Sequence, residues 1–95
     1  MEFDWNNTPL EMDGSLTQRE IEESFEDPFA IRLLPDSARF SVQARFFNLG
    51  VSAAGVGIFS VYRTNGRLAR VLQARAFEPE ELFFYQRKIN QTLQS

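Results

Sequence analysis

The chain contains neither cysteine nor histidine, and Lys88 is its only lysine. The absence of cysteine excludes disulfides, thiolate zinc sites and cysteine nucleophiles, and the absence of histidine removes the usual proton shuttle near neutral pH. The glycines at 50, 55 and 57 do not have the spacing of a phosphate-binding glycine motif. We therefore expect no metal and no cofactor. Any catalysis has to use carboxylates, arginines, hydroxyl groups and the backbone.

Long hydrophobic runs are also missing, and the first residues, MEFDWNN, are acidic where a secretion signal is basic and then apolar. These absences predict a cytoplasmic protein that does not enter a membrane. The chain has 95 residues, of which 43% are hydrophobic and 24% charged, close to the averages of globular proteins. This length and composition predict one folded domain over residues 1–95.

Charge is distributed unevenly along the chain. Residues 1–30 hold nine acidic residues and one arginine, whereas residues 31–77 hold seven arginines and one acidic residue. Arginine makes planar, bidentate contacts to phosphate or carboxylate, so the central region is a candidate anion-binding surface. A structural interpretation stays open, in which these arginines cover the solvent face of a sheet and pair with the acidic N-terminal helix.

Periodicity and turn residues predict an α+β domain, a small antiparallel sheet with two main helices in the order β-α-β-β-β-β-α. Thr17 and Glu20 form a capping-box pattern at the start of the first helix, and Asp27-Pro28 ends it. Asn65-Gly66 is typical of a two-residue type I′ hairpin, which needs positive φ at both positions. We expect strands at 3–5, 29–34, 39–49, 56–62 and 68–76, with loops at 6–14 and 50–57.

The second helix is expected to begin near Pro79, with Leu82, Tyr85, Ile89 and Leu93 on its apolar face. Phenylalanines at strand and helix positions are expected mainly in the core. Phe83 and Phe84 together exceed what one face of this helix can bury, which predicts either a homodimer contact or a groove for a protein partner.

Several strings resemble one known family: IEESFEDPFA (21–30), RFFNLG (45–50), FSVYRTNGRLARVLQARAF (59–77), EELFFY (80–85) and the opening FDW (3–5). They are similar to BrnT-type toxins, the ribonucleases of bacterial type II toxin-antitoxin pairs. In that family a helix ends in Phe-x-Asp-Pro, a strand carries an arginine before a Leu-Gly pair, and a hairpin leads into Arg-x-x-Ser-Ala-Arg. A helix with Glu-x-x-x-Tyr follows. This chain has Gln73 in the serine place.

The resemblance implies an endoribonuclease that works without metal, binds RNA and is inhibited by a cognate antitoxin. Carried over residue by residue, it implies the candidate catalytic residues Arg45, Arg70, Arg75, Glu81 and Tyr85. The arginines would stabilise phosphoryl oxygens while the 2′-oxygen attacks the phosphorus. Glu81 beside arginines would have a lowered pKa and act as a weak base. Alternatively, Glu81 is a helix N-terminal acid paired with Arg75, and Tyr85 is a core aromatic residue.

Two features of the sequence do not fit the catalytic roles that the family resemblance implies. The family usually has a lysine-bearing stretch ending near Lys-His-Gly before the capped helix, whereas this chain has neither lysine nor histidine before Gly14. In addition, Arg70 and Arg75 are five positions apart, which puts them on opposite faces of a regular strand unless a bulge intervenes. An alternative function is therefore a catalytically inactive interaction module that binds an acidic protein partner through its arginine-rich sheet.

Overall fold

The structure is a computed structural model that describes residues 2–6, 11–12, 16–33 and 45–94. Its elements run β1 (Glu2–Phe3), β2 (Glu11–Met12), α1 (Gln18–Glu26), β3 (Ile31–Leu33), β4 (Phe46–Val51), β5 (Gly57–Thr64), β6 (Leu68–Ala76) and α2 (Pro79–Gln94). The α+β class and the predicted order of the main elements are confirmed. Most of the strand predicted at 39–49 lies outside the described residues, and β4 extends into the predicted loop as far as Val51.

The strands form one sheet in the order β1-β6-β5-β4-β3, and β2 also pairs with β6. Pairing is antiparallel from β3 through β6, as the sequence predicts. The two-residue strands β1 and β2 run parallel to β6 along its outer edge, and β2 lies where a loop is expected. These short pairings cover a sheet edge that would otherwise leave backbone groups open.

α1 begins and ends where its local sequence predicts. The Thr17 hydroxyl accepts a hydrogen bond from the Glu20 backbone N–H (3.1 Å), and the Glu20 carboxylate accepts one from the Thr17 N–H (3.2 Å). Asp27 is the C-cap, and Pro28, which cannot continue the helix, follows it. These local contacts set where the helix begins and ends.

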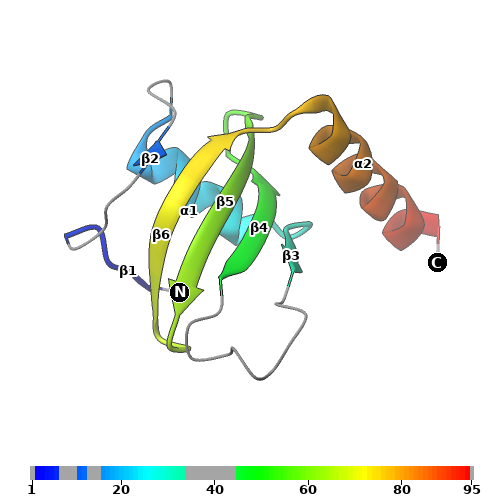
Figure 1. The fold of residues 1–95 in the computed structure, drawn as a ribbon. Coiled ribbons are helices and arrows are strands. Elements are labelled where there is room, and N and C mark those ends of the chain that lie inside the picture. Colours follow the sequence, from blue (N-terminus) through cyan, green and yellow to red (C-terminus); the bar gives the residue numbers. More distant parts are fainter. Residues whose placement is uncertain (1, 7–10, 13–15, 34–44, 95) are drawn as a thin grey trace.

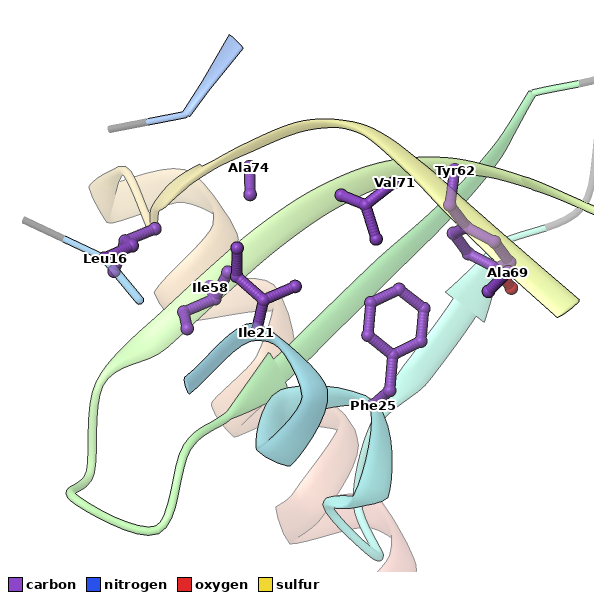
Figure 2. Packing of buried hydrophobic residues seen from close by; sticks show 8 residues of the cluster. All are labelled: Leu16, Ile21, Phe25, Ile58, Tyr62, Ala69, Val71 and Ala74. Carbon is purple, nitrogen blue, oxygen red and sulfur yellow. The ribbon is translucent and has the colours of Figure 1, made fainter. Parts of the chain in front are cut away.

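The core lies between α1 and one face of the sheet (Figure 2). Ile21 and Phe25 of α1 pack against Ile58 and Tyr62 of β5 and against small residues of β6. Ile21 is fully buried and Phe25 is 3% exposed. Gly50 of β4 allows a close approach here, because a Cβ at this position would lie 1.9 Å from the Ser24 carbonyl oxygen. Apolar burial on this side thus fixes α1 against the sheet.

The hairpin between β5 and β6 is confirmed, but the predicted type I′ turn is wrong. Of the two turn residues, only Gly66 has positive φ (94°), and Asn65 acts through its side chain. The Asn65 carbonyl oxygen Oδ1 accepts from the backbone N–H groups of Arg67 (2.9 Å) and Leu68 (3.0 Å). Pairing consequently places Thr64 opposite Ala69 and Arg63 opposite Arg70, so the connection is longer than two residues.

α2 is less buried than its pattern predicts. It extends away from the sheet beyond β4 (Figure 1), and Tyr85 is its only fully buried residue within 79–93. Ile89 is half-buried, whereas Leu82 and Leu93 of the expected apolar face are exposed. Phe83 is 67% exposed and Phe84 38%. Leu82 and Leu93, two of the four positions expected on the apolar face, therefore belong to the exposed surface of this helix.

Candidate functional site

A β-bulge in β6 determines which side chains share a sheet face. Val61 pairs with Gln73 while its neighbour Tyr62 pairs with Val71, so Leu72 is an extra residue between the two pairs. Val71 and Ala74 consequently both lie in the α1 core although they are three positions apart. The extra residue shifts the alternation of β6 by one and brings Arg70 and Arg75 to the same face.

That face is the one opposite α1, and its polar residues are mostly arginine. We define the arginine face as Arg63 of β5 together with Arg70, Gln73 and Arg75 of β6. The register pairs Arg63 with Arg70, Val61 with Gln73, and Phe59 with Arg75, while the intervening residues of both strands pack toward α1. Phe59 also stacks on Phe47 of β4, with ring centroids 5.8 Å apart.

Arg75 is held on both sides. Its guanidinium makes a bidentate ion pair with Glu81 of α2, with N–O distances of 2.6 and 2.8 Å, and lies 4.5 Å from the centroid of the Phe59 ring. The hydrogen bond from Arg75 lowers the pKa of Glu81, and the same bond raises the pKa of Arg75. Glu81 also accepts from the Glu78 N–H (2.8 Å), so it serves as an N-terminal acid of α2.

Arg70 lies near the hairpin end of the arginine face and pairs with Asp4, with an N–O distance of 3.2 Å. A surface depression at this end is lined by Asp4, Arg63, Thr64, Asn65, Leu68 and Arg70. Arg45 is exposed and immediately precedes Phe46, which pairs with Tyr62. Arg45 therefore lies at the end of β4 nearest Arg63.

Tyr85 belongs to a different part of the surface. Its hydroxyl donates to the Asp27 carboxylate, which also accepts from the backbone N–H groups of Val51 (2.8 Å) and Phe29 (2.9 Å). Burial raises the pKa of Tyr85, and the hydrogen bond to Asp27 raises it further. The depression beside this residue is lined in part by three acidic residues, Glu23, Glu26 and Asp27. An acidic depression repels phosphate, so this tyrosine is placed to anchor α2.

The five candidate residues thus divide into groups. Arg75 and Glu81 are in direct contact, Arg70 shares their sheet face, Arg45 lies at the β4 end of the same region, and Tyr85 is bonded elsewhere. Chemically, the arginine face can bind anions and stabilise negative charge on phosphoryl oxygens. Glu81, with its lowered pKa, is a weak proton acceptor.

Sequence reasoning missed Arg63 and Phe59 as members of this surface, and it treated Asp27 only as a helix stop. A two-residue turn would pair Arg63 with Leu68, so the assumed turn type concealed the pairing of Arg63 with Arg70. The signal for Asp27 was present in Asp-Pro, because Pro28 has no N–H and the carboxylate at this helix end can accept from other backbone N–H groups.

Comparison with protein-family models and with curated proteins gives no match to this chain. Within the described residues, no helix is long and apolar enough to cross a membrane. The same residues contain no group of three or more acidic side chains arranged to hold a metal ion. The arrangement defines an α+β domain with a mixed sheet, one face packed on α1 and the other carrying arginines.

Proposed function

We propose that this protein is a ribonuclease toxin of the BrnT type, which binds RNA on the arginine face and cleaves it without metal. The observation that carries the proposal is the bulge at Leu72, because it places Arg70 and Arg75 on one face despite their spacing of five. Two guanidinium groups on one surface can hold successive parts of a phosphodiester chain.

In this proposal Arg75 acts on the phosphoryl oxygens. Its contact with Glu81 and its position over Phe59 fix the guanidinium before substrate arrives, so little reorganisation is needed. Cleavage by the 2′-oxygen also requires a proton acceptor near the 2′-hydroxyl and a donor near the leaving 5′-oxygen. Glu81 is the carboxylate at Arg75 and takes the acceptor role, which its lowered pKa makes weak. As the 2′-oxygen bonds to phosphorus, the 5′-oxygen leaves and takes its proton from solvent water.

The test is RNA degradation by purified protein in the presence of a chelator. We expect wild-type protein to degrade RNA, and Arg75→Ala to lower the rate about a hundredfold, since loss of one transition-state cation costs roughly 3 kcal/mol. Arg70→Ala should also lower the rate, through weaker binding of the RNA backbone. Arg19→Ala is the matched control, because Arg19 is an exposed α1 residue paired with Glu23. Arg32 is a poorer control, since it donates to the Phe25 carbonyl at the end of α1 (2.9 Å).

Circular dichroism and urea unfolding of each variant separate a lost cation from a lost fold. Variants that remain folded and lose activity support the proposal. Intact RNA after incubation with clean wild-type protein contradicts it.

A cognate antitoxin is the protein partner in this proposal. It would place acidic or backbone acceptors against Arg45, Arg70 and Arg75 and cover exposed apolar surface of α2, such as Phe83. We expect Arg75→Glu to weaken this complex more at low salt than at high salt, because added salt screens the charge term. Unchanged affinity would show that the partner binds elsewhere.

A second candidate function is a catalytically inactive interaction module that binds an acidic protein partner through the arginine face, with α2 beside it. A homodimer through α2 is a further assembly of this kind. The specific observation in favour is the exposed apolar surface of α2, where Phe84 lies beside Arg87, Lys88 and Gln91. Such a surface fits an acidic amphipathic segment. Partner binding without RNA cleavage favours the module, whereas metal-independent cleavage that Arg75→Ala abolishes favours the enzyme.

A further inference from the structure

Two arginines face each other at the hairpin end of the arginine face. Arg63 of β5 and Arg70 of β6 are register partners on adjacent antiparallel strands. Like charges directly opposite each other in a sheet are destabilising unless an anion lies between or beside them. Among the described residues, the Arg63 side chain makes no ion pair and no hydrogen bond. It lines the surface depression at this end of the face, where a ligand can reach its N–H donors.

Asp4 compensates only part of this charge. One nitrogen of Arg70 contacts one oxygen of Asp4 at 3.2 Å, and the Arg70 side chain remains 48% exposed. A guanidinium group carries several N–H donors in a planar fork, so a single contact leaves most of them unused. Asp4 and both arginines line the same depression, where an incoming anion meets one carboxylate and two cations.

We propose that Arg63 and Arg70 form a phosphate-binding pair for the backbone of single-stranded RNA, with Asp4 competing for Arg70. The proposal rests on the proposed function for the identity of its ligand. It adds Arg63 as a binding residue and Asp4 as a carboxylate that weakens binding, neither of which the family resemblance assigns.

The position of the pair favours a linear polyanion over a small one. Arg70 and Arg75 are separated by roughly 15 Å along β6, given about 3.3 Å per residue in a strand. One free phosphate reaches only one end of this surface, whereas a strand of RNA reaches both. The ring of Phe59 lies at the Arg75 end, where a flexible single strand can also place a base against an aromatic or guanidinium plane.

Binding is tested with a fluorescent 2′-O-methyl RNA, which lacks the attacking hydroxyl and so stays intact. By fluorescence anisotropy we expect Arg63→Ala to lower affinity about tenfold at low salt and to reduce the salt slope by about one phosphate contact. Asp4→Asn should raise affinity about threefold, because it removes the partly buried carboxylate that competes for Arg70. The Asp4 carboxylate accepts a hydrogen bond from the Asn6 backbone N–H (3.1 Å). The side-chain oxygen of asparagine can still accept this bond in the variant.

Arg19→Ala is again the matched control, since it removes the same charge from an exposed site on α1, on the other side of the sheet. If Arg19→Ala and Arg63→Ala lower the affinity for RNA equally, the loss reflects only the change in net charge, and the proposed arginine pair is overturned. Wild-type affinity in both Arg63→Ala and Asp4→Asn, with a loss in Arg75→Ala, would also overturn the pair and leave the proposed function standing.

If neither wild-type protein nor any variant binds the oligonucleotide, the proposed function fails. The arginine pair is then tested with pyrophosphate alone. NMR signals of the Arg63 and Arg70 Nε–H groups should shift on titration in wild-type protein, and the Arg70 shift should be smaller in Arg63→Ala. Unshifted signals would overturn the anion site itself.

Discussion

α1 and α2 are attached to the sheet in opposite ways. α1 has nine residues; Ile21 and Phe25 are buried against β5 and β6, and Ser24 is buried against β4. α2 has sixteen residues, yet within 79–93 only Tyr85 is fully buried. Its attachments are largely polar: Glu81 to Arg75, and the Tyr85 hydroxyl to Asp27. The shorter helix is thus stabilised by apolar burial, the longer one by a few hydrogen bonds along one stripe.

This difference indicates where stability and binding reside. Burial against α1 supplies the hydrophobic term that holds the domain together. α2 instead presents Leu82, Phe83, Phe84 and Leu93 to solvent while its Glu81 orients an arginine on the open sheet face. Exposed apolar surface next to a charged face is typical of a binding element, so α2 connects the proposed RNA surface with a proposed partner surface.

The largest effect should come from Ile21→Ala on α1. Ile21 is fully buried, and removing its side chain leaves a cavity that costs about 3–4 kcal/mol in free energy of unfolding. The matched change on α2 is Leu82→Ala at a 44% exposed position, with an expected cost below about 0.5 kcal/mol. Urea unfolding measures both. Similar losses for the two variants would mean that α2 is packed as tightly as α1.

A smaller effect is expected for Tyr85→Phe, which removes the hydroxyl that donates to Asp27. Hydrogen bonds to charged groups contribute about 1.5–3 kcal/mol, and the lower end applies because Asp27 keeps its backbone donors Val51 and Phe29. Amide hydrogen exchange should accelerate in α2 more than in α1. Equal acceleration in both helices would contradict separate attachment of α2.

The smallest effect concerns the pH dependence of the Glu81 ion pair. Because the pKa of Glu81 is lowered in the folded state, its contribution to stability is complete above its ordinary value of 4.5 and is lost as pH falls through the folded value. Glu81→Gln should therefore lower stability at pH 7 by less than about 1 kcal/mol, since surface ion pairs are weak.

The difference between Glu81→Gln and wild-type protein should shrink as the pH falls below 4.5, measured by urea unfolding at several pH values. A difference that stays constant into acid would show that the ion pair with Arg75 does not stabilise α2.

The parts of the fold that were predictable depend on interactions among near neighbours in the chain. Thr17 and Glu20 satisfy each other's backbone across one helical turn, and Asp27-Pro28 ends α1 for reasons of backbone chemistry. The Arg75–Glu81 contact was predictable as one of two alternatives, because six residues separate them at the start of a helix. The turn at Asn65 was only partly predictable. The Asn65 side chain accepts from the Arg67 backbone N–H, which a different turn type would bond to another acceptor.

The sequence by itself determined the helix ends, the presence of the hairpin and the α+β class, because caps, turn residues and alternation act within a few residues. Tertiary structure alone decided the rest. The bulge at Leu72 depends on cross-strand register, and register is set by how β5 and β6 both pack against α1. That register placed Arg63 opposite Arg70 and brought Arg75 onto the same face.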